Sequence, residues 1–179
     1  MRFHFPIIII DEDFRSENAS GLGIRRLAEA IEAEGMEVLG VTSYGDLSSF
    51  AQQQSRASAF ILSIDDEELA NEEEATIAGL RAFVAGVRTR NAEIPIFLHG
   101  ETRTSRHIPN DILRELHGFI HMFEDTPEFV ARHIIREAST YLASLAPPFF
   151  KALVEYAKDG SYSWHCPGHS GGVAFLKSP

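Results

Sequence analysis

Four consecutive isoleucines, Ile7 to Ile10, run directly into three acidic residues, Asp11, Glu12 and Asp13. An unbroken β-branched run of this kind predicts a strand that is buried on both faces, as the inner strands of parallel sheets are. Similar apolar runs recur along the chain, and stretches with helical spacing separate them. This alternation is typical of a parallel sheet that is covered by helices on both faces.

The pattern predicts five β/α units. The strands are expected at residues 6–10, 37–42, 59–64, 94–98 and 118–123. The helices between them are expected around residues 24–34, from residue 46 onward, and around residues 67–90 and 111–116. Units of this length predict an α/β fold of the flavodoxin or receiver type, a (βα)5 doubly wound parallel sheet with strand order 2-1-3-4-5.

A last helix is expected to open at Thr126 and Pro127. Threonine is a favourable N-cap, and proline is favoured at the first helical position. The residues that this helix is predicted to bury are Phe129, Val130, Ile134, Ala138 and Leu142.

Two prolines, Pro147 and Pro148, mark a boundary after this helix, because the residue before each proline is disfavoured in helical geometry. We therefore expect a first domain over residues 1–146, and then a linker helix at 149–158 with an extended tail. The tail is rich in glycine and proline and too short to bury a core of its own. It is expected to lie on a larger fold that this chain does not contain.

The bulk composition excludes some partners. A formal net charge of −10 argues against a nucleic-acid partner, which requires clustered lysine and arginine. No apolar stretch reaches the length that crosses a bilayer, so no membrane partner is expected. The single cysteine, Cys166, and an N-terminus unlike a signal peptide predict a cytoplasmic protein.

Acidic residues follow two of the predicted strands: Asp11, Glu12 and Asp13 after the first, and Asp65 after the third. In a doubly wound sheet these side chains gather at one edge, where they could bind Mg²⁺ and offer a carboxylate for phosphorylation. This pattern resembles response-regulator receiver domains. Those domains also place a lysine at the end of strand five, whereas residues 119–125 contain none. Since that cation is missing, we favour the other interpretation, in which the acids cap helices.

The run Ser20-Gly21-Leu22-Gly23 has some likeness to a phosphate-binding loop, but it lacks a third glycine and a Lys-Ser/Thr pair. We interpret it as the start of a helix.

The tail offers three possible metal ligands, His165, Cys166 and His169. A structural zinc site needs four, and a nucleophilic cysteine needs a base and an oxyanion site that a tail without a core cannot hold in place. We therefore expect no metal and no catalytic residue in this chain. Glycines at 168, 171 and 172 are suited to sharp turns or close backbone approach.

Three separated motifs carry a family resemblance: PPFFKAL at residues 147–153, WHCPGHSGG at 164–172 and LKSP at 176–179. In this order and spacing they resemble the bacterial ornithine, lysine and arginine decarboxylases, which are pyridoxal-phosphate enzymes of fold type I. Phe123 to Thr126 is also similar to members of that family. One departure is Cys166, where the family usually has threonine.

The resemblance implies that residues 1–146 are a wing domain that assembles dimers into larger rings. It implies that residues 147–179 are a linker helix and the start of the cofactor-binding core. The full enzyme would convert ornithine, lysine or arginine into a polyamine and CO₂, which helps a cell resist acid. The cofactor lysine would lie downstream, so this fragment is expected to be non-catalytic and to bind no pyridoxal phosphate. The residues that would open the core are Trp164, His165, Pro167, Gly168, His169, Gly171 and Gly172.

Overall fold

The computed structural model describes residues 5–43, 57–64, 66–100, 107–121, 124–145, 161–165 and 173–177. Residues 66–73 and the last two ranges are described by their backbone alone. The chain divides into two compact units, one over His4–Tyr141 and one that includes Leu142–Pro179.

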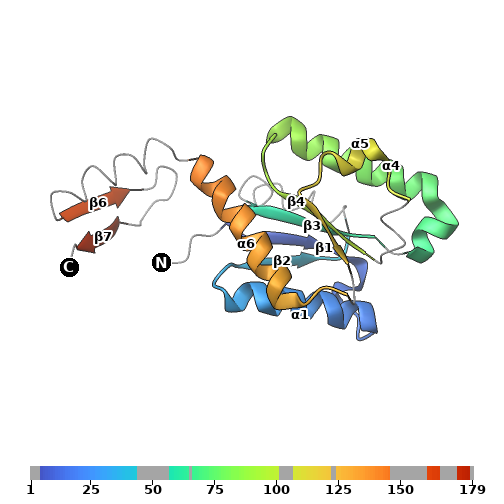
Figure 1. Cartoon of the computed structure of the whole chain (residues 1–179), viewed down its shortest axis with the longest axis horizontal. Helices are drawn as coiled ribbons and strands as arrows, with labels where there is room; N and C mark the ends of the chain where they lie inside the picture. The colour runs from blue at the N-terminus through green and yellow to red at the C-terminus, as the bar shows by residue number, and fades with distance from the viewer. Residues whose placement is uncertain are drawn as a thin grey trace. The chain divides into compact units, whose positions relative to one another are not determined.

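The first unit is built on a five-stranded sheet in which every pairing is parallel (Figure 1). The strand order is β2-β1-β3-β4-β5, which confirms the predicted fold and topology. The strand bounds are Ile7–Ile10 for β1, Val38–Val41 for β2, Ala59–Ser63 for β3, Ile96–Gly100 for β4 and Gly118–His121 for β5.

Helices lie on both faces of this sheet (Figure 1). The helices α1 (Ala19–Ala33) and α6 (Pro127–Ser144) cover one face, where Ile24 and Ile134 join a buried cluster with Ile7 and Ile9. The helices α4 (Asp66–Arg90) and α5 (Asn110–Leu113) lie on the other face. A short 3₁₀ helix, η1 (Glu12–Arg15), connects β1 to the segment before α1.

Strand β1 is the inner strand that the isoleucine run predicts. Ile7, Ile8 and Ile9 are 0% exposed and Ile10 is 3% exposed. Because β1 pairs with β2 on one side and β3 on the other, its backbone groups are also satisfied within the sheet.

Several details of the prediction are wrong. Strand β4 begins at Ile96 and not at residue 94, because Ile94 is buried in the preceding turn, where its carbonyl accepts a side-chain hydrogen bond. Phe129 was expected to be buried in α6, but it is 65% exposed. The buried residues of α6 are Val130, Ala131, Ile134, Ala138 and Tyr141. Leu142 was also expected to be buried, but it is only partly buried, because Tyr141 takes the place on the buried stripe. Phe129 lies one position before this stripe and so falls on the solvent side.

The second unit contains a β-hairpin. Strand β6 (Ser161–His165) pairs antiparallel with β7 (Val173–Lys177), in a register that sets Ser161 opposite Lys177 and His165 opposite Val173. The sequence predicted an extended tail here, and the structure adds that its two extended segments pair with each other. The helices expected from Asp46 and over 149–158 lie outside the described residues.

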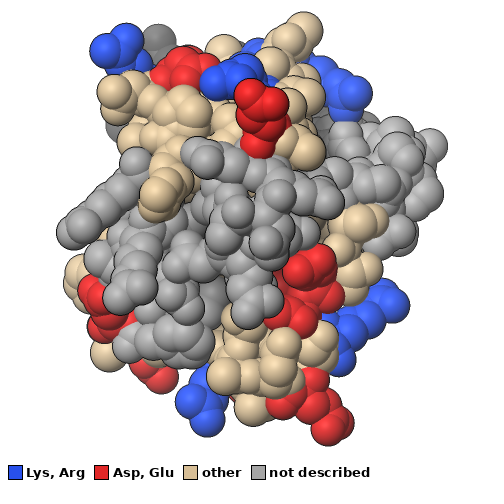
Figure 2. All heavy atoms as spheres, turned by 90° about the vertical axis from the view of Figure 1, so that its right-hand side faces the viewer, with Lys and Arg blue, Asp and Glu red and all other residues tan. Residues whose placement is uncertain are grey.

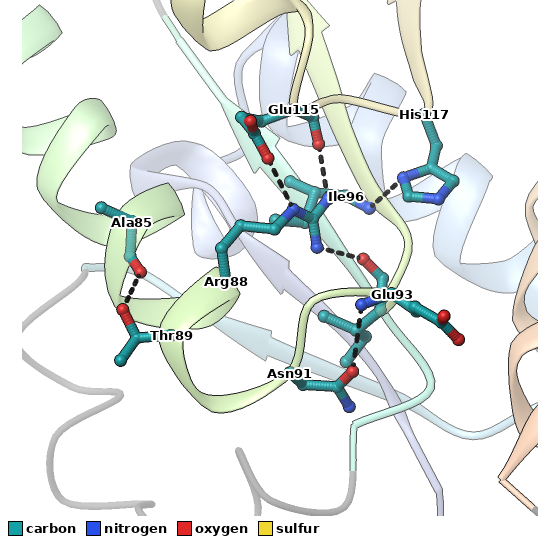
Figure 3. Close-up of polar contacts among 9 residues, drawn as sticks. Ala85, Arg88, Thr89, Asn91, Glu93, Ile96, Glu115 and His117 are labelled. Carbon is teal, nitrogen blue, oxygen red and sulfur yellow. Dashed lines mark hydrogen bonds and ion pairs between the residues drawn. The ribbon is translucent and has the colours of Figure 1, made fainter.

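The C-terminal part of α4 is fixed to the sheet by Arg88 (Figure 3). Its Nη1 donates to the carbonyl of Ile94 at 2.7 Å, and its Nε and Nη2 donate to the carboxylate and carbonyl of Glu115 at 3.1 and 2.5 Å. The Arg88 side chain is only 15% exposed, and this burial lowers the pKa of its guanidinium. One planar donor group thereby joins α4 to the segments that precede β4 and β5.

A second arginine of α4 provides a matched comparison. Arg81 binds Asp111 of α5 at 2.8 Å, but the two side chains are 51% and 59% exposed. An exposed pair of this kind contributes little, because water and salt screen it.

We therefore predict that Arg88→Ala lowers the free energy of unfolding by about 2 to 3 kcal/mol, since it leaves the buried Ile94 carbonyl without its donor. Arg81→Ala should leave the urea midpoint close to that of the parent chain. Urea unfolding followed by circular dichroism measures both variants. Equal losses in the two would contradict the role given to Arg88.

Candidate functional site

The acids after β1 serve local structure in the described part of the chain. Asp11 is 4% exposed, and its Oδ1 accepts a hydrogen bond from the backbone nitrogen of Asp13 at 2.8 Å, as the cap of η1. Glu12 is exposed and Asp13 is partly buried. Among the described residues no group of three or more histidine, cysteine, aspartate or glutamate side chains is arranged to hold a metal ion. The geometry of Asp11 supports the capping interpretation, while Asp65 lies outside the described residues.

The run Ser20 to Gly23 lies in the first turn of α1, which agrees with its interpretation as the start of a helix. The backbone is closely packed there. A Cβ at Gly21 would collide with the backbone carbonyl oxygens of Asp13 and Ser16. Arg25, one turn further along α1, donates to the carbonyl oxygens of Phe14 and Ser16. These contacts fix the start of α1 against η1. The backbone nitrogen of Gly21 already donates a hydrogen bond to the Oδ1 of Asn18.

The carboxyl edge of the sheet is the edge at which its strands end, and it holds a cavity of about 280 Å³ that the sequence did not predict. We call it the edge cavity. Its walls come from α1, from the ends of β4 and β5, and from the beginning of α6. The side chains that matter for its chemistry are Arg26, Leu27, His99, His121, Asp125 and Val130. In open α/β sheets this edge is where ligands usually bind.

His99 forms the inner wall of the edge cavity. It is 4% exposed, and its Nδ1 lies 3.2 Å from the hydroxyl oxygen of Ser63. Burial lowers the pKa of His99 to about 4, because the charged imidazolium would lose its hydration. The side chain is therefore neutral at pH 7.

His121 and Asp125 form the outer wall. The Oδ2 of Asp125 accepts a hydrogen bond from the backbone nitrogen of His121 at 2.8 Å and so closes the turn between β5 and α6. The imidazole of His121 lies against the ring of Phe119, with centroids 4.9 Å apart. Within the described structure the Nδ1 of His121 is buried and has no hydrogen-bond partner.

Figure 2 shows the face on which the strands end, with acidic and basic side chains interspersed around its rim. The described residues of this face form no continuous basic surface. A groove for a phosphate backbone would need one.

The predicted core-opening segment is described only in part. Trp164 and His165 are the last two residues of β6, and they pair with Ala174 and Val173 of β7. Pro167, Gly168, His169, Gly171 and Gly172 lie outside the described residues, so the role predicted for them stays a prediction.

Comparison with protein families gives two adjacent matches. Residues 19–141 match the model of the Orn/Lys/Arg decarboxylase N-terminal domain, and residues 147–179 match that of the Orn/Lys/Arg decarboxylase major domain. The chain belongs to the Orn/Lys/Arg decarboxylase family.

Individual relatives of this family member support that assignment. The chain is 34% identical to lysine decarboxylase LdcA of Pseudomonas aeruginosa over 98% of its own length and 23% of the relative. It is 27% identical to the biodegradative arginine decarboxylase of Escherichia coli over 97% of its length and 22% of that enzyme. The chain therefore spans less than a quarter of the length of these two curated relatives.

Solved structures give the same result. Lysine decarboxylase A from Pseudomonas aeruginosa superimposes with a TM-score of 0.72 and 32% identity, over 94% of this chain and 22% of that one. A response regulator receiver domain protein from Clostridium thermocellum superimposes with a TM-score of 0.54 and 13% identity, over 76% of this chain and 95% of that one. The second likeness shows a shared fold alone. Among the helices that the structure describes, none is long and apolar enough to cross a membrane.

The burial of His99 predicts a pH-dependent stability. Its folded pKa of about 4 lies below the ordinary 6.5, so the unfolded chain binds the proton more readily. The free energy of unfolding is therefore not reduced by His99 above pH 6.5, and it declines as the pH falls below that value. The loss is about 2 kcal/mol at pH 5 and about 3 kcal/mol near pH 4.

We predict that His99→Gln reduces the difference in unfolding free energy between pH 7 and pH 5 by about 2 kcal/mol relative to the parent chain. Urea unfolding at the two pH values measures this difference. His107→Gln is the matched control, because His107 is exposed. If His99→Gln kept the same pH dependence as the parent, the neutral buried histidine would not be its source.

Proposed function

We propose that this chain is the N-terminal assembly domain and the start of the catalytic core of a cytoplasmic, pyridoxal-phosphate-dependent decarboxylase of a basic amino acid. The observation that carries the proposal is the pair of family matches in chain order, an N-terminal domain at 19–141 and a major domain from 147. The change of compact unit between Tyr141 and Leu142 falls at the same place. Both observations support a boundary near residue 146.

The wing domain has no residue that could attach the cofactor. Pyridoxal phosphate binds covalently to a lysine amine and, when bound, takes up the electron pair that is left as CO₂ departs. Every cation in residues 1–150 other than histidine is arginine, and the three lysines are Lys151, Lys158 and Lys177. The wing therefore does not fit the cofactor, and we propose that catalysis belongs to the core downstream of residue 179.

The substrate class follows from the relatives. Their names specify lysine, arginine and ornithine as substrates, and all three carry a second basic group. The proposed reaction releases CO₂ from the α-carbon and leaves an amine that takes up a proton, which would raise the pH of an acidified cell. The described wing contains nothing that selects among the three amino acids.

The proposed role of the wing is to join dimers into larger rings. Phe129 supports this role, because an aromatic side chain that is 65% exposed loses water when another subunit covers it. Exposed acids surround it in sequence, namely Glu124, Asp125 and Glu128. With a net charge of −10, subunits repel one another at neutral pH, and protonation of carboxylates at lower pH weakens that repulsion. Association should therefore strengthen as pH falls.

The test uses the full-length protein with pyridoxal phosphate. We predict that Phe129→Ser shifts sedimentation at mildly acidic pH from large assemblies towards dimers and leaves turnover per subunit within about twofold, since the core is unchanged. Leu22→Ser is the matched control, because Leu22 is an exposed apolar residue of α1, at 47% exposure. Assemblies that were unaffected by Phe129→Ser would exclude this face. A full-length protein that decarboxylated none of lysine, ornithine and arginine would overturn the proposed function.

A further inference from the structure

The edge cavity presents two opposite charges that do not neutralise each other. Arg26 enters it from α1, and Asp125 enters it from the turn before α6. Within the described structure Arg26 forms no hydrogen bond or ion pair, and Asp125 uses its Oδ2 for the backbone of His121. One guanidinium and one carboxylate oxygen, Oδ1, are thus available on different walls of one cavity.

Between these charges the lining is apolar. Leu27, Ile120 and Val130 contribute to it, and each belongs to the buried core of the wing. His99 adds no charge at pH 7, because its buried imidazole is neutral. The volume of the cavity, about 280 Å³, is slightly below the range of roughly 300 to 1,000 Å³ that is usual for drug-sized ligands, so a small metabolite suits it.

The charges select the ligand class. A simple anion would be attracted by Arg26 and repelled by Asp125, and a simple cation would meet the reverse. A molecule with both a carboxylate and an ammonium group satisfies both side chains, since guanidinium binds carboxylate in a two-pronged arrangement and carboxylate accepts from ammonium. An aliphatic body between or beside these groups would contact the apolar lining.

We propose that the edge cavity of the wing is a binding site for a small aliphatic amino acid, with its carboxylate on Arg26 and its ammonium group on Asp125. The site lies wholly within residues 23–130 and contains no cofactor attachment residue. It is therefore separate from the proposed decarboxylation site and does not depend on that activity.

The test titrates this 179-residue chain with four six-carbon probes, norleucine, 6-aminohexanoate, hexanoate and hexylamine, by calorimetry. We expect saturable binding of one or both amino acids, and at least tenfold weaker binding of hexanoate and hexylamine, because each of these lacks one charged group. Amide NMR shifts on binding should involve Gly23 and Asp125, which line the cavity.

Two variants place the site. Arg26→Gln and Asp125→Asn should each weaken amino-acid binding at least tenfold. The side-chain amide introduced by Asp125→Asn retains an oxygen for the His121 nitrogen, so the turn is preserved. The matched controls are Arg132→Gln and Glu128→Gln, which change exposed charges of α6 that do not line the cavity.

Three outcomes would overturn the proposal. Equal binding of hexanoate and norleucine, with no effect of Asp125→Asn, would indicate an anion site. Tight binding of hexylamine would indicate a cation site. No saturable binding of any probe would show that the cavity is not a site.

Discussion

The complete burial of β1 restricts where the parallel sheet of the wing domain can form a polar binding site. Ile7 to Ile9 are inaccessible to solvent, and the strand has a parallel neighbour on each side. A parallel sheet with such a strand must be covered by helices on both faces, so neither face is left for a ligand. Polar groups are confined to the two edges where strands begin and end. The carboxyl edge holds Asp11 and the edge cavity, and the opposite edge holds the Arg88 network.

The sequence predicted the fold because its apolar runs identify each of the five strands of the parallel sheet, and five β/α units of this length are typical of the doubly wound type with this strand order. Its errors have local physical causes. Ile94 gives the apolar signal of a strand residue, but its carbonyl is used by Arg88, and Pro95 after it has no N–H for a ladder. Phe129 is apolar but lies one residue outside the stripe of α6. The residue type shows only that a side chain is apolar. Whether it is buried depends on its position around the helix axis.

The edge cavity could not be predicted in the same way. Arg26 and Asp125 belong to the first and last helical regions of the wing, and only the wound sheet brings them to one edge. Arg26 lies in no motif, and Asp125 lies in the family-like run Phe123 to Thr126, where the sequence indicates only a turn residue before a helix. The hairpin was missed for a related reason. Strand β6, with the sequence SYSWH, has no apolar run like those of the parallel sheet, and glycines lie between it and β7.

A fall in pH has two opposite effects on this domain: it weakens the repulsion between subunits, and it lowers the stability of the folded domain. Protonation of surface carboxylates reduces the repulsion that comes from a net charge of −10 and so favours the proposed contact between subunits. Protonation of His99, which is favoured in the unfolded chain, removes stability as the pH falls from about 6.5 towards 4. Anything that binds only the folded wing offsets such a loss by mass action, by about 2.7 kcal/mol at a hundred times its dissociation constant. If the wing associates more strongly in acid, contact with neighbouring subunits therefore raises its free energy of unfolding. This gain comes at the pH values at which the titration of His99 lowers that free energy. Assembly and folding of this domain are then linked, and a subunit that cannot associate should be the first to unfold as the pH falls.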